Sequence, residues 1–329
     1  MRLLVTGGAG YVGSHVARQL TDGGHEVTVL DNLSTGHAWA VLGGRLVQAD
    51  LGDRPRVSAV LAQGRFDAVL HFAASIVVPD SVREPLAYYR NNTVNLQALL
   101  ELCVEHGVQR FVFSSTAAVY GLPETMPVRE DALASPINPY GASKLMGEWM
   151  LRDTAAAATG LRYVALRYFN VAGADPGGRI GQATANATHL IKVACETALG
   201  RRPRLSVFGT DYATADGTAV RDYIHVEDLA RAHLMALDFL ASGGASEVLN
   251  CGYGHGHTVR EVIDSVKRIS GRDVPTQDAP RRPGDAPVLY ADTSRIKRVL
   301  GWTPRHDDLD FIVGSALRWE RVMMERRKG

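Results

Sequence analysis

The sequence has few cysteines and no long apolar segment. Nowhere among its 329 residues do about 18 apolar residues follow one another, as a membrane-spanning helix requires. The apolar run at the N-terminus meets Gly7 and Gly8 too early for a secretory signal peptide. The 3 cysteines, Cys103, Cys195 and Cys251, stand far apart and form no CxxC or zinc-binding spacing. These absences predict a reduced, cytoplasmic protein.

The sequence also lacks an excess of charge of one sign. Lysine and arginine number 36 and aspartate and glutamate 35, which gives a formal net charge of +1. Nucleic acids and anionic membranes attract strongly basic surfaces, so neither is expected as a partner. No metal site is expected either, because His255 and His257 share a loop without further ligands nearby in the sequence. A small molecule is the expected partner.

Short β-branched runs alternate with longer amphipathic segments through the first half of the chain. RLLVTG, EVTVLDN, DAVLHFAA and RFVFSST are typical of strands, and VGSHVARQLTDGG and NNTVNLQALLELCVEHG of helices that end at glycines. This alternation predicts an α/β protein with a Rossmann-type doubly wound parallel sheet. A second, smaller α/β substrate lobe is expected, because 329 residues exceed the usual size of one core.

The later segments divide between these two parts. The helix YIHVEDLARAHLMALDFL and the strand EVLNCG are expected to return to the first sheet. Thr258 and Glu261 form a capping box that predicts the start of the helix VREVIDSVKRIS. We therefore predict a Rossmann domain from residues 1–173 plus about 223–253, and a substrate-binding lobe from about 174–222 plus 254–329.

A glycine-rich turn follows the first predicted strand. In TGGAGYVG, Gly7, Gly10 and Gly13 have the spacing GxxGxxG. Glycine lets the backbone approach a diphosphate closely, and the N-terminus of the following helix offers free N–H groups to that anion. The position between a strand and a helix predicts a dinucleotide site at the carboxyl ends of the strands.

Two aspartates follow the next strands. The second predicted strand ends in LDN, which places Asp31 about 20 residues after the glycines. A carboxylate there can accept hydrogen bonds from both ribose hydroxyls and would repel a 2′-phosphate, which favours NAD over NADP as the cofactor. Asp50, after the third predicted strand, could contact the adenine. The alternative for Asp31 is an aspartate that caps its own loop.

Tyr140 and Lys144 lie four residues apart in NPYGASKLMGEWM, on one face of a predicted helix. Alone, such a pair is usually an ordinary surface pair. In a dry cleft, an ammonium ~5 Å away stabilises a phenolate by roughly 3 kcal/mol at an effective dielectric constant of ~20. That energy lowers the pKa of the phenol by about 2 units, and a positive nicotinamide nearby would lower it further. Together they would bring the phenol within range of a general base.

Longer motifs show a resemblance to a known family. With the glycine turn, FSSTAAVYG and the pair Tyr140 and Lys144, the chain resembles the extended short-chain dehydrogenase/reductase family. TGGAGYVGSH, LDNLSTG, HFAA, NPYGASKLMGE, LRYFNVAGA, VFGTDYATADGTAVRDYIHVEDLA and APRRPGD resemble the UDP-glucose 4-epimerases within it, over nearly the whole chain. The resemblance implies bound NAD, and interconversion of UDP-glucose and UDP-galactose through a 4-keto intermediate. It implies Thr116, Tyr140 and Lys144 as the catalytic residues.

The resemblance also implies two sets of binding residues. The cofactor residues are Gly7, Gly10, Tyr11, Val12, Gly13, Asp31, Asn32, Asp50, Leu51, Phe72, Ala73, Ala74, Asn91, Ser114, Tyr140, Lys144 and Tyr168. The UDP-sugar residues are Thr116, Tyr140, Asn170, His189, Leu190, Phe208, Arg221, Arg282, Asp285 and Leu289. Arginine suits a diphosphate because its guanidinium group can bind two oxygens at once. A single arginine can equally be a solvated surface charge, as Thr116 can be a threonine that bonds only its own backbone.

Three positions depart from the family pattern. Ile76 stands where some epimerases have a lysine that reaches toward the cofactor, and His189 stands where asparagine is frequent. Leu289 stands where enzymes strict for glucose and galactose have tyrosine. Because leucine is shorter, we expect room for an acetamido group, so that UDP-GlcNAc and UDP-GalNAc are also accepted.

Several alternatives remain open. A 4-epimerase for UDP-glucuronate or a UDP-pentose uses the same residues, and a non-catalytic NAD-sensing regulator could keep the fold. A dehydratase is disfavoured because Ala117 and Ala118 stand where it needs an acidic pair, and a four-electron sugar dehydrogenase is disfavoured because no cysteine lies in a motif near the catalytic strand ends. The family also implies a homodimer through the helices that start near Asn91 and Tyr140. Their extra apolar residues are Leu99, Leu100, Leu102, Met146 and Met150.

Overall fold

The computed structural model describes residues 1–157, 160–185, 187–282 and 284–326. Seven parallel strands form its large sheet, in the order β11-β6-β5-β4-β1-β2-β3. The strands are β1 (Arg2–Thr6), β2 (Glu26–Asp31), β3 (Arg45–Gln48), β4 (Ala68–His71), β5 (Arg110–Thr116), β6 (Arg162–Tyr168) and β11 (Glu247–Cys251). The predicted Rossmann-type doubly wound sheet is confirmed, and β11 returns to it beside β6.

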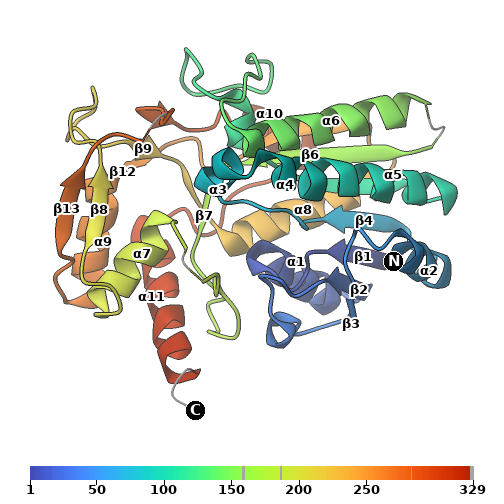
Figure 1. The fold of residues 1–329 in the computed structure, drawn as a ribbon, viewed down its shortest axis with the longest axis horizontal. Helices are drawn as coiled ribbons and strands as arrows, with labels where there is room; N and C mark the ends of the chain where they lie inside the picture. Colours follow the sequence, from blue (N-terminus) through green and yellow to red (C-terminus); the bar gives the residue numbers. More distant parts are fainter. Residues whose placement is uncertain (158–159, 186, 283, 327–329) are drawn as a thin grey trace.

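Helices cover both faces of this sheet (Figure 1). Apolar residues of α1 (Tyr11–Asp22) and α8 (Val226–Ala241) share one core with Leu3 and Val5 of β1. Residues of α2 (Arg54–Gly64), α5 (Asn95–Glu105) and α6 (Pro139–Ala157) share the other core with Leu4. The alternation of Leu3, Leu4 and Val5 between the two cores follows from the two-residue period of a strand.

The segments outside the large sheet form three small sheets. They are β7 (Asn170–Ala172) with β10 (Tyr223–His225), β8 (Leu205–Phe208) with β13 (Thr276–Ala279), and β9 (Val220–Arg221) between β12 (His257–Thr258) and β14 (Val288–Leu289). Figure 1 shows β8 and β13 with α7 (Leu190–Ala198), α9 (Val259–Ser270) and α11 (Leu309–Arg326) at one end of the molecule. The predicted domain boundaries stay a prediction.

The remaining helices are short. They are the 3-10 helices η1 (Ala38–Ala40) and η3 (Ala117–Tyr120), the π-helix η2 (Tyr89–Val94), α3 (Val78–Arg83), α4 (Pro85–Tyr88) and α10 (Ser294–Leu300). The predicted capping box is present at α9, where Thr258 accepts from the Glu261 N–H and Glu261 accepts from the Thr258 N–H. Within the described ranges, no helix combines the length and apolar character that a membrane crossing needs.

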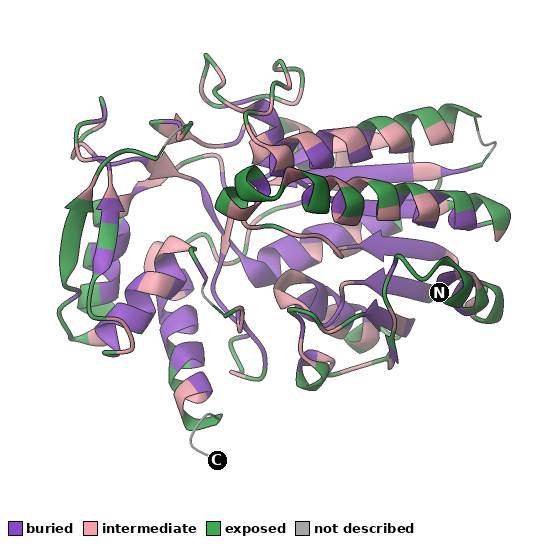
Figure 2. Cartoon of the chain, viewed as in Figure 1, coloured by how far each residue is buried: buried purple, intermediate pink, exposed green. Residues whose placement is uncertain are grey.

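The apolar residues of α5 that suggested a dimer face lie inside the protomer. Leu99, Leu100 and Leu102 are buried in the core beneath the sheet, so their assignment to a free face was wrong. Helix α5 packs against α2 and α6 and shares a core with strand residues such as Phe111, which explains why apolar residues occupy more than one of its faces. Figure 2 shows mostly buried strands in the large sheet and green, exposed outer faces on the helices around it.

Candidate active site

The glycine turn after β1 is packed too tightly for side chains. Gly7 has a φ of +71°, and a Cβ there would lie 2.5 Å from the backbone nitrogen of Ala73. A Cβ on Gly13 would lie 2.3 Å from the carbonyl oxygen of Gly7. Gly10 caps α1 without a side chain, so the first N–H groups of the helix stay available. The cradle and the positive helix end fit the diphosphate of a dinucleotide.

Asp31 organises the loop beside this turn. Its Oδ2 accepts a hydrogen bond from the Ala9 N–H at 2.9 Å, and its Oδ1 accepts from the Leu33 N–H at 2.8 Å. The carboxylate therefore caps its own loop, as the alternative for this residue proposed. Each oxygen keeps a further lone pair, so ribose recognition by Asp31 stays a prediction.

The other predicted cofactor residues lie at the carboxyl ends of the strands. Asn32 donates from Nδ2 to Asp50 Oδ2 at 2.6 Å, so these two predicted residues meet beyond β2 and β3. Asn91 donates to Ser75 Oγ at 3.0 Å, after β4. The residues that follow are in the same region: Leu51 lies after β3, Phe72, Ala73 and Ala74 after β4, and Ser114 and Tyr168 near the ends of β5 and β6, joined by a hydrogen bond between their hydroxyls.

The three predicted catalytic residues come together above β5. Thr116 ends this strand, and its hydroxyl is near enough to the phenol of Tyr140, in the first turn of α6, to lower the pKa of that phenol. Tyr140 is only 9% exposed and Lys144, one turn later, only 3%. The Nζ of Lys144 donates to the carbonyl oxygen of Ser114 at 2.8 Å and lies 5.0 Å from the centre of the Phe113 ring. The pair is buried, and a surface pair is excluded.

The expected acidification of the phenol is wrong for the protein alone. Burial raises the pKa of Tyr140 to about 12, and the nearby hydroxyl of Thr116 only partly opposes this rise. Burial also lowers the pKa of Lys144 to about 7. Taking either charged form out of water is costly, and the ammonium is directed to Ser114. The expected fall in the pKa of Tyr140 required a full positive charge on Lys144, and burial makes that charge less stable.

A buried ion pair holds α6 against the sheet. Arg167 of β6 donates to Glu148 of α6, with Nη2 at 2.6 Å from Oε2. Ser115 donates to the same carboxylate at 2.5 Å, next to Thr116. The pair fixes the helix that carries Tyr140 relative to the strand that carries Thr116. Sequence reasoning missed it, because the two charges stand in unrelated motifs.

Asn92 was also missed and lies at the centre of a second contact with α6. Its side chain accepts from the Ser75 N–H at 2.8 Å and donates to the Ser75 carbonyl at 2.9 Å. It lies 3.0 Å from Ser143 Oγ, between Tyr140 and Lys144 in the chain. The only sequence signal is a pair of asparagines within an otherwise helical pattern.

The predicted substrate residues form two clusters. In the first, the Arg282 guanidinium lies 3.9 Å from the centre of the Phe208 ring. Arg221 forms an ion pair with Asp285 and is paired with Leu289 across β9 and β14. An aromatic ring, two cations and a carboxylate at one place suit a ligand with a planar base and phosphates.

The second cluster lines a cavity between β7 and α7. Asn170, His189 and Leu190 contribute to its wall, together with Gln182. The side-chain amide of Gln182 lies 2.8 Å from His189 Nδ1 and orients that ring. Burial lowers the pKa of His189, so its ring is neutral at pH 7. Gln182 was not predicted, because it precedes the recognisable motif.

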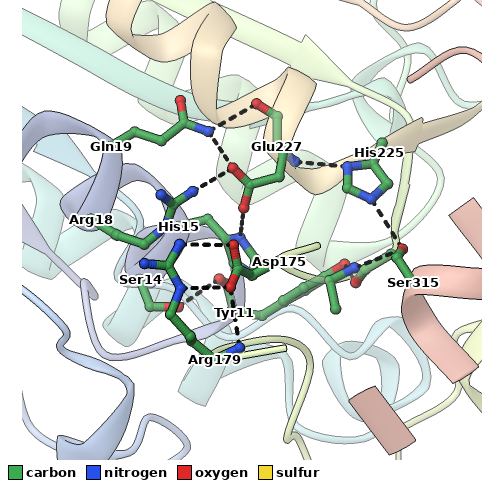
Figure 3. Close-up of polar contacts among 12 residues, drawn as sticks. Tyr11, Ser14, His15, Arg18, Gln19, Asp175, Arg179, His225, Glu227 and Ser315 are labelled. Atoms are coloured by element: carbon green, nitrogen blue, oxygen red, sulfur yellow. Dashed lines mark hydrogen bonds and ion pairs between the residues drawn. The ribbon is translucent and has the colours of Figure 1, made fainter. Parts of the chain in front are cut away.

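A polar network connects the glycine turn with the rest of the molecule (Figure 3). Glu227 at the start of α8 accepts from Arg18 at 2.5 Å and Gln19 at 2.6 Å, and it bonds the ring of His15 at 2.5 Å. Tyr11 donates from its hydroxyl to the carbonyl oxygen of Gly173 at 2.6 Å. The first turns of α1 are thereby held to α8 and to the segment after β7.

The fold and the site define a nucleotide-binding α/β protein with a buried tyrosine and lysine at the ends of the parallel strands. Residues 3–252 match the family described as the NAD dependent epimerase/dehydratase family, and the chain belongs to this family.

Within this family, the chain is similar to relatives and solved structures that are named UDP-sugar 4-epimerases. A UDP-glucose 4-epimerase of Azospirillum brasilense is 60% identical over 98% of this chain and 92% of its own. The structure of UDP-glucose 4-epimerase from Brucella ovis in complex with NAD is similar at 47% identity and a TM-score of 0.93, over 96% of this chain and 97% of that chain. The UDP-Glc/GlcNAc 4-epimerase of Campylobacter jejuni is similar at 49% identity and a TM-score of 0.86, over 97% and 99% of the two chains.

Proposed function

We propose that this protein interconverts UDP-glucose and UDP-galactose, with NAD as a bound cofactor. The observation that carries the proposal is the burial of Tyr140 beside Thr116 at the end of β5. It places a proton acceptor and a hydroxyl ligand on the sheet edge that also carries the glycine turn. Similarity to UDP-glucose 4-epimerases over almost the whole chain supports the same activity.

Four groups of the chain fit NAD. The turn from Gly7 to Gly13 holds the diphosphate, and the carboxylate of Asp31 faces the adenosine ribose and disfavours the 2′-phosphate of NADP. Lys144 and Ser114 lie at the nicotinamide end. When bound, NAD supplies the hydride acceptor and donor for the sugar carbon.

Tyr140 removes the proton from the 4-hydroxyl of the sugar, and Thr116 holds that hydroxyl and the phenol in line. Because burial raises the pKa of Tyr140, the phenolate must form together with ligand binding and not before it. Lys144 is buried one helical turn from Tyr140 and is the basic residue of α6 that is nearest to the phenol in sequence. The resulting 4-keto sugar takes back its hydride on the opposite face after the ring has turned.

The turning of the sugar requires firm binding of the nucleotide and loose binding of the ring. Phe208 and Arg282 offer a stacked platform for the base end. Arg221, already paired with Asp285, is positioned for phosphate oxygens. Asn170 and the neutral ring of His189 add hydrogen-bonding groups that carry no charge.

The acetylated sugars are a second proposed substrate pair. Leu289 is half-buried, next to Arg221 on the neighbouring strand, and presents no hydroxyl or ring. The similar Campylobacter jejuni protein is named a UDP-Glc/GlcNAc 4-epimerase. A UDP-pentose remains a candidate as well, since the similar Stenotrophomonas maltophila structure holds a formylated UDP-arabinopyranose.

Three further expectations belong to the same proposal. The Rossmann part, residues 1–173 plus about 223–253, holds NAD, and the lobe of about 174–222 plus 254–329 holds the UDP-sugar. The enzyme works in the cytoplasm as a homodimer. Free, buried Cys103, Cys195 and Cys251 are consistent with a reducing compartment. Exposed Val94 and Trp149 on η2 and α6 offer apolar surface for a second copy.

The direct assay uses the purified protein with UDP-glucose and no added reductant. The proposal expects UDP-galactose to accumulate until both sugars reach equilibrium, and NAD to be released when the protein is denatured. UDP-GlcNAc and UDP-glucuronate are assayed in parallel to define the sugar range. A protein that binds NAD but converts none of these sugars would instead be a regulator.

A further inference from the structure

A second cavity lies beside the glycine turn. Gly10 and Tyr11 form one wall, and Thr35, His37 and Trp39 of the β2–β3 connection form another. Thr184, from the segment before α7, also lines this cavity. Since Gly10 caps α1, the cavity adjoins the place where the diphosphate of the dinucleotide is proposed to bind.

The β2–β3 connection is fixed to the glycine turn at one end. The N–H of His37 donates to the carbonyl oxygen of Ala9 at 3.0 Å. A Cβ on Gly36 would lie 2.9 Å from the carbonyl carbon of Ala9, so the two segments are in close contact. The connection therefore starts as a second layer directly over the turn.

At its other end the connection reaches a helix from the far end of the chain. The ring of Trp39, on η1, lies 5.8 Å from the ring of Trp319 on α11, measured between centroids, and is stacked on His37 at 5.1 Å. Trp319 is 1% exposed, and its Nε1 donates to the Gln182 carbonyl, so it offers a fixed surface. Trp39 is 38% exposed, so it lies at the edge of the contact and not inside the core.

A cation covers the two tryptophans. The guanidinium of Arg326, in the last turn of α11, lies 4.4 Å from the centre of the Trp39 ring and 5.4 Å from that of Trp319. It also donates to the carbonyl oxygen of Arg179 at 3.4 Å. Cation–π contacts of this kind are favourable at half-exposed sites. Arg326 thus adds a second contact that must break before Trp39 can move away from α11.

We propose that Trp39, held by Trp319 and Arg326, retains the dinucleotide by closing its cleft. The connection that carries Trp39 must lift from α11 before the diphosphate can leave past the wall that it forms. Slow release does not slow this reaction, because the cofactor returns its hydride to the same sugar and need not leave. The inference rests on the proposed function. It adds that the β2–β3 connection acts as a strap that slows release of the dinucleotide.

The test compares release of NAD from the intact protein and from Trp39→Ala. Each protein is loaded with NAD and diluted into alcohol dehydrogenase with ethanol, which reduces each released dinucleotide. We expect release from Trp39→Ala to be roughly tenfold faster, the size that loss of an aromatic pair and a cation–π contact gives.

Two further variants separate retention from a general loss of structure. Trp39→Phe keeps an aromatic ring and should restore most of the slow release. Leu42→Ala is the matched control, since Leu42 follows η1 and is 44% exposed. It should release NAD at the rate of the intact protein. Equal rates of NAD release from Trp39→Ala and the intact protein would overturn the proposal. Equally fast release from Trp39→Ala and Trp39→Phe would overturn it as well, because the ring would then not be responsible.

Arg326 provides an independent measurement. Arg326→Gln should speed release less than Trp39→Ala, and the double variant should release NAD no faster than Trp39→Ala alone, because both residues act through one contact. Effects that multiply would contradict a shared strap. The outcomes also distinguish this inference from the proposed function: an intact protein without NAD or epimerisation removes the function, whereas an active protein with unchanged release removes only the strap.

Discussion

Lys144 donates a hydrogen bond from its Nζ to the carbonyl oxygen of Ser114 at 2.8 Å, one helical turn from Tyr140. Burial lowers the pKa of the ammonium to about 7 from 10.5. Between these two values the unfolded chain holds a proton that the folded chain has released. The free energy of unfolding should therefore rise with pH across this window.

The first prediction follows from that sign. In protein freed of dinucleotide, Lys144 should add about 2 kcal/mol to the free energy of unfolding between pH 7 and pH 9. Urea unfolding at both values, compared with Lys144→Met, isolates this contribution, because other titrating groups are common to both proteins. Parallel pH dependences of the intact protein and the variant would refute the lowered pKa.

The second prediction concerns the phenol and its partner. Tyr140→Phe should lower kcat by about 10²- to 10⁴-fold, the usual contribution of a general base. Thr116→Ser keeps the hydroxyl beside Tyr140 and should stay within about tenfold of the intact enzyme, whereas Thr116→Ala should fall further. Steady-state rates with bound NAD verified for each variant provide the check. Comparable rates for Thr116→Ser and Thr116→Ala would count against a role for the hydroxyl.

The third prediction compares two neighbouring arginines. Arg282 lies over Phe208, and Arg281 pairs with Asp211 and lies over Tyr212. If Arg282 holds the nucleotide, Arg282→Ala should weaken UDP binding by about 10- to 150-fold, since a hydrogen bond to a charged group contributes about 1.5–3 kcal/mol. Arg281→Ala is the control and should weaken it by less than about threefold. Calorimetric titration with UDP measures both, and equal losses would remove the special role of Arg282.

The fourth prediction concerns the buried ion pair behind the site. Arg167→Met leaves the Glu148 carboxylate buried without its cation and should cost about 3–5 kcal/mol of folding free energy. The double variant with Glu148→Gln should recover part of that loss. Denaturant unfolding of the three proteins gives the comparison. A loss below about 1 kcal/mol for Arg167→Met would show that water reaches the carboxylate.

The fifth prediction concerns the sugar range. Leu289→Tyr should reduce turnover of UDP-GlcNAc by about tenfold or more and leave UDP-glucose within about threefold, because a larger side chain excludes the acetamido group. Chromatography of both product pairs measures the ratio. Loss of both activities in parallel would show that Leu289 supports the structure of the site and does not select the sugar. No change in either activity would show that Leu289 does not contact the sugar.

Local patterns predicted much of this fold for physical reasons. Strand and helix periods, the turn glycines and the capping box at Thr258 act over a few residues, so they can be read in one segment. The longer motifs indicated which residues to propose as catalytic, and those roles stay a prediction. Thr116, Tyr140 and Lys144 lie close together above β5, where the motifs suggested.

Side-chain pairs between distant segments were beyond such reasoning. Nothing local connects Arg167 with Glu148, or Trp39 with Trp319, because each pair forms only when two elements pack. The pKa of Tyr140 was mispredicted for a related reason. Spacing indicates which charge is near, whereas the degree of burial, which here dominates, depends on the whole fold.

The central claim is that one hydride leaves carbon 4 of the sugar and returns to the same carbon inside a closed site. UDP-glucose carrying deuterium at carbon 4 tests it most directly, with the UDP-galactose product analysed by mass spectrometry and NMR. The account predicts that the deuterium stays at carbon 4 of the product. Loss of the deuterium to water, or its transfer to another carbon, would contradict it.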